Sequence, residues 1–130
     1  MHGLGKRVFR DATIYEGEWR KGVQHGRGLE LFPSGGVYEG EFEGGQKHGR
    51  GRRRMVAAIK HMIQQGSSTC EIADLFVDPE VRAALIGLIG TGTLVHEGDW
   101  EHNMEKTAFK LDDEFYEDLH TTIGIGQEEE

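Results

Sequence analysis

The side chains best suited to chemistry in this 130-residue sequence are its histidines, of which there are seven. His25 and His48 lie 23 residues apart in equivalent sequence contexts. If each belongs to one hairpin of a sheet, two strand spacings separate them, roughly 9 to 10 Å. No Cys/His cluster has the spacing of a zinc site. We therefore expect both histidines to be turn residues, with no metal ion and no cofactor bound.

The other nucleophilic and acidic side chains do not form a catalytic set either. Cys70 stands in a capping-box sequence, and the N-terminus of the helix that it would begin favours the thiolate form of its side chain. The alternative is that Cys70 is a small core residue without a chemical role. Asp112 and Asp113 are consecutive, so on a helix end their carboxylates point apart and suit capping. No Ser/His/Asp arrangement, phosphate loop or nucleotide motif is present. We expect no catalytic residue and no enzymatic activity.

One basic run contrasts with an acidic chain. Residues 1–54 carry a net charge of +4 and residues 55–130 carry −12, which together give the net charge of −8. The run consists of Arg50, Arg52, Arg53 and Arg54. Because an apolar-faced helical pattern follows it, the run suits an anionic membrane surface, an acidic partner or the acidic half of the chain. The acidic balance argues against nucleic acid as a partner.

A repeat of 23 residues organises the first part of the chain. Residues 15–18 (Tyr-Glu-Gly-Glu) recur at 38–41, and residues 25–28 (His-Gly-Arg-Gly) recur at 48–51. The same step backwards reaches His2-Gly3-Leu4-Gly5, so a partial repeat precedes two full ones. The 20 glycines are about twice the number expected from the average composition of proteins, and they recur at fixed positions of this repeat.

Each repeat has the pattern of an antiparallel hairpin. Tyr15, Gly17 and Trp19 alternate with two glutamates, the period of a half-buried strand, and the same pattern returns in Tyr38, Gly40 and Phe42. Glycine between two aromatic residues leaves a slot for a neighbouring ring or backbone. Residues 20–24 predict the hairpin loop, and residues 33–36 turn the chain into the next unit. Successive units are therefore expected to extend one meandering sheet.

The motif Y-E-G-E-W-x-x-G-x-x-H-G-x-G, as it stands at residues 15–28, resembles the MORN (membrane occupation and recognition nexus) repeat. The resemblance covers about residues 2–51, under half of the chain. It implies an elongated, twisted antiparallel sheet of stacked hairpins without catalysis of its own. Proteins with such repeats scaffold cytoskeletal or ciliary structures, and some are credited with binding phospholipid.

The rest of the chain departs from the repeat. Apolar residues at helical spacing from Met55 to Ile63, a capping box at 68–71 and Asp78-Pro79 predict three short helices within residues 52–92. Residues 93–111 keep a Gly and a Trp of the repeat but lose its later residues, so a degenerate repeat hairpin and a non-repeat segment both stay open. Residues 112–130 predict a short helix and an acidic tail. The fold class is thus α+β, with a β-meander over residues 1–51 followed by short helices.

Two complete hairpins are too few to bury a continuous apolar face by themselves. The leading hypothesis is therefore a non-enzymatic scaffold subunit of a larger assembly, cytoskeletal or ciliary axonemal as the resemblance suggests, with other protein subunits as partners. Its interaction face would consist of Tyr15, Gly17, Trp19, Tyr38, Gly40 and Phe42. The alternatives are a phosphoinositide or membrane-surface module that uses the arginine run, and the regulatory arm of an enzyme complex.

The expected compartment follows from cysteine usage. The single cysteine and the lack of a secretory signal favour a reducing, cytoplasmic location, with a cilium, flagellum or other cytoskeletal structure as the setting that the resemblance implies. The longest apolar stretch, residues 83–90, is too short to span a bilayer.

Overall fold

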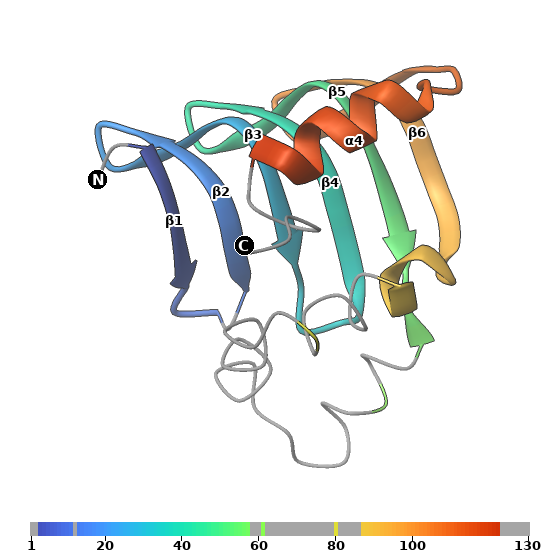
Figure 1. The fold of residues 1–130 in the computed structure, drawn as a ribbon, viewed down its shortest axis with the longest axis horizontal. Coiled ribbons are helices and arrows are strands. Elements are labelled where there is room, and N and C mark those ends of the chain that lie inside the picture. The colour runs from blue at the N-terminus through green and yellow to red at the C-terminus, as the bar shows by residue number, and fades with distance from the viewer. Residues whose placement is uncertain (1–2, 12, 58–60, 62–79, 81–86, 123–130) are drawn as a thin grey trace.

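The computed structural model describes residues 3–11, 13–57, 61, 80 and 87–122, which form one antiparallel sheet with a helix across it (Figure 1). The strands are β1 (Gly3–Val8), β2 (Ile14–Arg20), β3 (Val23–Leu31), β4 (Gly36–Glu43), β5 (Gln46–Met55), β6 (Thr93–Glu101) and β7 (Met104–Ala108). They lie side by side in chain order, so the sheet is a meander. The helix α4 (Asp113–Thr122) follows the last strand. The predicted α+β meander followed by helix is confirmed.

The repeat is visible in the register of the strands. Gly17 on β2 lies opposite Gly28 on β3, and 23 residues later Gly40 on β4 lies opposite Gly51 on β5. A side chain on Gly28 would overlap the hydroxyl of Tyr15, and one on Gly51 would overlap the hydroxyl of Tyr38. These glycines are therefore needed because a tyrosine hydroxyl occupies the space that a Cβ atom would fill.

The strand β5 is longer than the sequence predicts. We expected the repeat to stop after Gly51 and a helix to begin at Met55, but β5 runs on through Met55. The reason is pairing on both sides, because Arg52 lies opposite Glu39 on β4 and opposite Glu97 on β6. Val56 then donates its backbone N–H to the carbonyl of Gly35. Interstrand pairing thus overrides the local helical pattern at this end.

A third hairpin pairs directly with the second one. β6 lies next to β5 although residues 56–92 separate them in sequence, and Gly98 on β6 occupies the place opposite Gly51. Residues 93–111 therefore contain β6, β7 and the connection to α4. Of the helices expected within residues 52–92, most positions lie outside the described residues, while residues 87–90 are helical and turn at Thr91.

Alternation along the strands gives the sheet two different faces. On the helix face, aliphatic residues of β2, β3 and β4 form a core with Val56, Ile89, Leu111 and three residues of α4, namely Phe115, Tyr116 and Leu119. On the opposite face, rings from successive repeats pack against one another. Ile14 and Tyr15 show the division, because these neighbours belong to different clusters.

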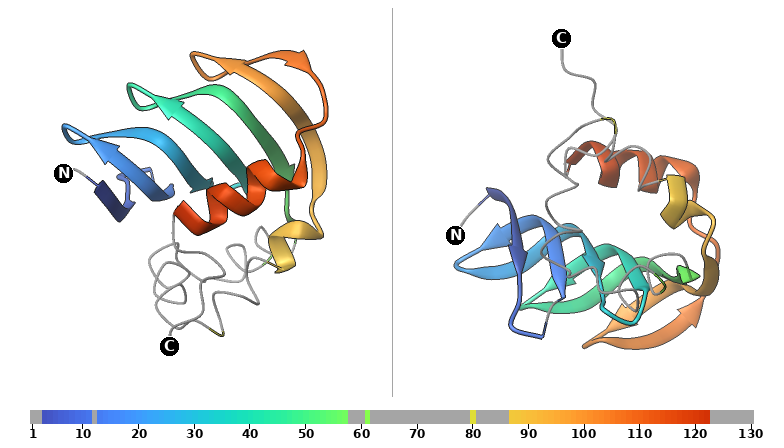
Figure 2. Two further views of the ribbon diagram at one scale, coloured as in Figure 1. Left: turned by 45° about the horizontal axis from the view of Figure 1, so that its top comes forward. Right: turned by 90° about the horizontal axis from the view of Figure 1, so that it is seen from below.

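The helix α4 covers the aliphatic face, packing on β3 and β4 (Figure 2). Asp112 caps it by accepting a hydrogen bond of 2.9 Å from the N–H of Phe115. The helix α4 thus crosses the face of the sheet. Within the described part of the chain, no helix is long and apolar enough to cross a membrane.

Candidate functional site

Five rings form a continuous stack across the repeats, which we call the aromatic ladder: Tyr15, Trp19, Tyr38, Phe42 and Trp100. In space the rings follow the order Trp19, Tyr15, Phe42, Tyr38 and Trp100, and each contacts the next edge to face, with centroids 5.0 to 5.1 Å apart. Such T-shaped pairs are favourable beyond the area that they bury. The ladder therefore couples the three hairpins into one unit.

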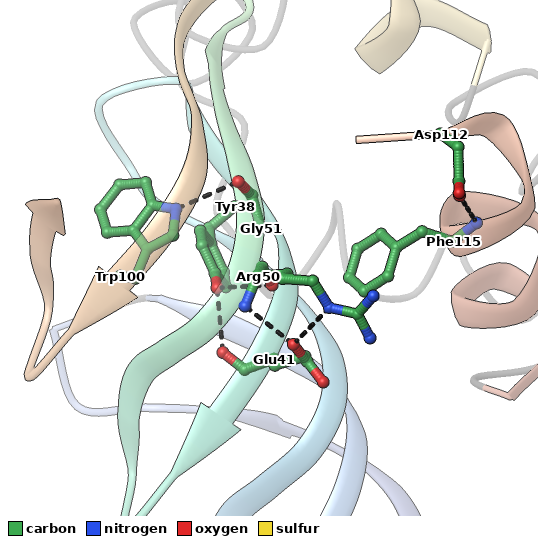
Figure 3. Close-up of polar contacts among 7 residues, drawn as sticks. All are labelled: Tyr38, Glu41, Arg50, Gly51, Trp100, Asp112 and Phe115. Atoms are coloured by element: carbon green, nitrogen blue, oxygen red, sulfur yellow. Dashed lines mark hydrogen bonds and ion pairs between the residues drawn. The ribbon is translucent and has the colours of Figure 1, made fainter. Parts of the chain in front are cut away.

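Hydrogen bonds fix the rings of the ladder. The hydroxyl of Tyr15 donates to the carbonyl of Glu18 at 2.8 Å, and that of Tyr38 donates to the carbonyl of Glu41 at 2.9 Å (Figure 3). Burial raises the pKa of both hydroxyls well above the usual tyrosine value. They therefore stay protonated and donate over the whole physiological pH range.

These positions correct part of the sequence-based interpretation. The predicted interaction face, Tyr15, Gly17, Trp19, Tyr38, Gly40 and Phe42, is filled by its own rings. Its aromatic side chains are at most 5 % exposed, and Tyr15 and Tyr38 are fully buried. The argument that another molecule must cover these rings fails because Trp100 of the third hairpin completes the stack. Sequence reasoning noticed the Gly and Trp at residues 98 and 100 but did not count them as a full repeat.

A groove crosses the same side of the sheet, above the ladder. Its volume is about 730 Å³, and we call it the aromatic groove. Its lining includes Phe32, Pro33, Ser34, Lys47, Arg53, Trp100, Asn103, Met104 and Glu105. A second hollow of about 380 Å³ shares Asp11, Thr13 and Phe32 with it and continues it towards Phe9. The surface open to a partner is thus this groove rather than the buried rings below it.

Lys47 is the central cation of the aromatic groove. Its Nζ lies 4.8 Å from the ring centroid of Phe32, 5.7 Å from that of Tyr38 and 5.9 Å from that of Trp100. It also lies 3.7 Å from a carboxylate oxygen of Glu30. Burial lowers the pKa of Lys47, against the opposing effect of Glu30. This ammonium is held among rings, the arrangement of a cation–π site.

Glu30 is a buried carboxylate below the groove. It accepts a hydrogen bond of 2.8 Å from the side-chain amide of Gln24, the residue that stands 23 positions before Lys47. Burial raises the pKa of Glu30 in spite of Gln24 and Lys47. The two residues at equivalent repeat positions thus converge on one acid.

The arginine run is divided between the two faces of the sheet. Arg53 faces the aromatic groove and pairs with Glu105 at 3.3 Å. Arg52 faces α4, where it pairs with Glu39 at 3.1 Å and stacks 3.6 Å from the ring centroid of Tyr116. Arg54 donates to the carbonyl of Gly92 at 2.8 Å. The alternating directions of strand residues separate the side chains of these neighbours.

Arg50 also has partners within the chain. Its backbone N–H and its side chain both bind the carboxylate of Glu41, at 2.8 and 3.2 Å (Figure 3). Its guanidinium lies 4.7 Å from the ring centroid of Phe115. The run therefore does not form the single basic patch that the lipid-contact prediction needs. Its residues bind acids and rings of the same chain instead.

Glu39 anchors the helix to the sheet. His120 of α4 approaches one of its carboxylate oxygens at 2.6 Å, and Arg52 holds the other. Burial alone would raise the pKa of Glu39, but His120 and Arg52 together lower it. The hydroxyl of Tyr116 donates to Glu97 beside this group. The polar contacts of α4 are thus structural.

The histidines and acids singled out in the sequence fall into separate places. His48 lies 3.2 Å from Glu43 and packs against His102, with ring centroids 5.6 Å apart, near the hairpin turns. Across the described residues, no group of three or more His, Cys, Asp or Glu side chains is placed to hold a metal ion. Cys70 lies outside the described residues.

Sequence comparison agrees with the strand register. The family model of the MORN repeat matches residues 1–13, 15–37 and 38–55. The last match ends at Met55, where β5 ends. A search of curated proteins gave no significant match.

Proposed function

We propose that this chain, in which the MORN repeat model matches residues 1–13, 15–37 and 38–55, serves as a non-enzymatic interaction subunit of a larger assembly and binds a partner protein in the aromatic groove. MORN repeats are commonly modules that bind proteins or membranes. The proposal adds a protein partner and a surface to that general role.

One observation carries the proposal, namely that the two faces of the sheet are covered differently. The helix α4 covers the aliphatic face, whereas the opposite face carries an open groove of about 730 Å³. Phe32 and Arg53, which are both half-buried, supply the aromatic and arginine contacts typical of binding hot spots. Met104, 62 % exposed, adds an apolar contact at its margin. Rings below a rim of charged residues match the anatomy of a protein interface.

A membrane surface is the less favoured partner because of the arginine pairing. Arg50, Arg52 and Arg53 each have a carboxylate partner within 3.3 Å. Contact with anionic lipid would have to break these pairs, which offsets the attraction of about 1 kcal/mol per basic residue at such a surface. The regulatory arm of an enzyme complex would use the same groove and is a special case of the proposal.

The cellular setting that we propose rests on the family resemblance. Repeats of this type occur in proteins that scaffold cytoskeletal and ciliary structures, so a cytoplasmic, ciliary or other cytoskeletal complex is the proposed environment. The groove itself is compatible with any assembly in which a partner protein has a segment complementary to the groove.

Site-specific photo-crosslinking in cells that express the chain tests the proposal. A photoreactive amino acid replaces Ser34, which is exposed and lines the groove, or Glu117, which is exposed on α4 as the control position. We expect a discrete protein adduct, identifiable by mass spectrometry, from position 34 and not from position 117.

A matched pair of variants completes this test. Met104→Asp places a charge on the exposed rim of the groove and should abolish the adduct, whereas Leu4→Asp alters a similarly exposed apolar residue on β1 and should leave it intact. An adduct that survives Met104→Asp, or equal labelling from both positions, would contradict the groove as the binding surface.

A further inference from the structure

Lys47 and Glu30 form a polar pair at the wall of the aromatic groove that the proposed function does not use. The Nζ of Lys47 lies 3.7 Å from a carboxylate oxygen of Glu30, and the two side chains are only 13 % and 11 % exposed. Lysine and glutamate are seldom buried to this extent in folded proteins. The pair therefore needs a physical reason of its own.

The repeat does not require an amine at position 47. Lys47 stands 23 residues after Gln24, and the side-chain amide of Gln24 donates a hydrogen bond of 2.8 Å to the same carboxylate of Glu30. An uncharged side chain thus occupies the equivalent place in the preceding hairpin and satisfies the same acid. The amine of Lys47 is therefore a chemical group that the packing of the hairpins does not depend on.

The backbone of Lys47 fixes where this amine lies. Its N–H donates to the side-chain Oδ1 of Asn103 at 2.8 Å, and its carbonyl accepts from the N–H of Asn103 at 2.9 Å. These two hydrogen bonds tie Lys47 to the turn between β6 and β7. The side chain then runs beside the rings of Phe32 and Trp100, with Nζ 4.8 and 5.9 Å from their centroids. The amine is thus held at one place in the groove, and such positioning favours reaction with a bound molecule.

Burial changes the proton affinity of both groups. It lowers the pKa of Lys47 and raises the pKa of Glu30, although each partner opposes the shift of the other. The charge of Arg53 lowers the pKa of Lys47 further, and the charge of Asp11 raises that of Glu30. Both shifts favour the form in which the lysine is a neutral amine and the glutamate a carboxylic acid. A neutral amine is a nucleophile, and a carboxylic acid beside it can donate a proton.

The groove beside Lys47 has room for a small molecule. Its volume of about 730 Å³ lies within the range of ligand sites in proteins. The half-buried ring of Phe32 and the exposed side chain of Met104 supply apolar contacts, while Ser34 and Asn103 supply polar ones. A ligand with an apolar body therefore fits these walls, with its reactive atom next to the amine.

We propose that Lys47 binds aldehydes with an apolar body, aromatic ones above all, as a reversible imine, and that Glu30 is the acid in this reaction. The amine nitrogen bonds to the aldehyde carbon, and a proton passes from the nitrogen to the carbonyl oxygen. Glu30 then protonates the resulting hydroxyl group, which leaves as water while the nitrogen lone pair forms the C=N bond. The products are a cationic imine and the carboxylate of Glu30, so an ion pair forms at this place. The reaction does not depend on the protein partner proposed for the groove.

Reductive trapping on the full chain tests the proposal. The protein is incubated at pH 7 with benzaldehyde and sodium cyanoborohydride, which reduces an imine to a stable secondary amine, and the benzyl groups are located by peptide mass spectrometry. We expect Lys47 to be labelled at least about tenfold faster than Lys106 and Lys110, which are both exposed. With acetaldehyde, which lacks the apolar body, this preference should shrink.

The variant Glu30→Gln tests the role of the acid. The amide can still accept from Gln24 but cannot protonate the departing hydroxyl group, so labelling of Lys47 should slow at least about tenfold. Loss of the negative charge would by itself favour the neutral amine and speed the reaction, so slower labelling distinguishes a proton donor from a merely electrostatic neighbour. Glu105→Gln is the matched control, because it neutralises another carboxylate of the groove, one that pairs with Arg53, and should leave the rate unchanged.

Three results would overturn the proposal. They are equal labelling of Lys47 and the two exposed lysines, the same preference for Lys47 with both aldehydes, and labelling of Lys47 in Glu30→Gln that is as fast as in the unmodified chain. Lys47→Gln restores the residue type found at position 24 and should keep the melting temperature and the protein adduct from position 34 while this label is lost. Failure of aldehyde binding is therefore distinguishable from failure of the proposed function.

Discussion

The indole Nε1 of Trp100 donates a hydrogen bond of 3.1 Å to the carbonyl oxygen of Gly51, 49 residues earlier in the chain. Trp19 makes the equivalent bond, at 3.0 Å, to the carbonyl of Gly5. In each case an indole reaches back to a glycine of the preceding repeat, and Gly5 and Gly51 differ by two repeat lengths. The third hairpin is therefore joined to the array by the same contact that joins the first two units, although the 37 residues from 56 to 92 separate β6 from β5 in the sequence.

Replacing Trp100 should loosen the third hairpin. Trp100→Ala removes a ring that is 4 % exposed and contacts both Tyr38 and His96, so we expect a loss of about 3 to 5 kcal/mol in the free energy of unfolding. Trp100→Phe keeps a ring, as Phe42 does at the equivalent position, and should cost about 1 kcal/mol for the lost hydrogen bond. Urea denaturation measures both values. Equal effects from the two substitutions would show that packing of the ring is not what stabilises this contact.

The same size of loss is expected inside the first two repeats. Trp19→Ala and Phe42→Ala each remove a buried ring from the aromatic ladder and should cost about 3 to 5 kcal/mol. Phe109→Ala serves as the control, because this ring is 41 % exposed and lies outside the ladder. Thermal unfolding followed by circular dichroism makes the comparison. An unchanged melting temperature for Trp19→Ala or Phe42→Ala would contradict their assignment to the core.

His96 and Ala108 replace a tyrosine and a glycine together, and we expect the two changes to be coupled. His96 packs on Trp100 at 5.1 Å and approaches the carbonyl of Asp99 at 3.3 Å, as Tyr38 packs on the same ring and binds the carbonyl of Glu41. Ala108 lies opposite Gly98, where the earlier repeats have a second glycine beneath the tyrosine hydroxyl. His96→Tyr alone should therefore overpack this site and cost about 1 to 3 kcal/mol.

A double-mutant cycle measures this coupling. Ala108→Gly alone should cost about 0.5 to 1 kcal/mol, as glycine does within a strand, but in the His96→Tyr background it should restore stability by making room for the hydroxyl. His96→Phe is the matched control, because it lacks the hydroxyl and should depend less on residue 108. Additive effects of His96→Tyr and Ala108→Gly would show that the two positions do not share this slot.

Two buried glutamates on opposite faces should respond to pH with opposite signs. The folded-state pKa of Glu39 is lowered, so its carboxylate stabilises the fold above the unfolded value near 4.5, and this stabilisation is lost as pH falls through the folded value. The pKa of Glu30 is raised, so its contribution is greatest below about 4.5 and declines as pH rises through the folded value. Glu39→Gln should therefore be more destabilising at pH 7 than at pH 4.

Glu30→Gln provides the contrast. Its stability relative to the unmodified chain should improve from pH 4 to pH 7, because the amide removes a buried charge while it can still accept from Gln24. Free energies of unfolding from urea titrations at both pH values measure the trend. The same direction of change in the two variants would mean that burial and the His120 and Arg52 contacts do not set these pKa values as described.

The repeat could be predicted from sequence because its signals are local. The 23-residue offset, the alternation around Gly17 and the turn residues at 33–36 lie within single units, and together they predicted the meander. Helical spacing after Met55 was misleading at its first position, because interstrand pairing of β5 depends on β6, which lies beyond residue 92. Local periodicity carries no information about a strand partner so far along the chain.

The aromatic groove could not be predicted for a related reason. Lys47 meets Phe32 and Trp100 only because three hairpins place them on the same face, and no spacing in the sequence indicates this meeting. For the arginine run, by contrast, the sequence suggested a common surface that the structure does not form. Adjacent in sequence, Arg52 and Arg53 look like one patch, yet the alternation of a strand sends them to opposite faces.

This separation of Arg52 and Arg53 predicts different consequences for equivalent substitutions. Arg52 is 17 % exposed in its side chain, stacks on Tyr116 and neutralises Glu39, so Arg52→Ala should leave a buried carboxylate with His120 alone and cost about 3 kcal/mol or more. Arg53 pairs at the surface with Glu105, and Arg53→Ala should cost less than about 1 kcal/mol. Urea denaturation at low and high salt checks this, because only the weak contribution of Arg53 should be screened. Equal costs for the two variants would indicate that both arginines are solvated on one basic surface, and with it the lipid-binding alternative would regain its physical basis.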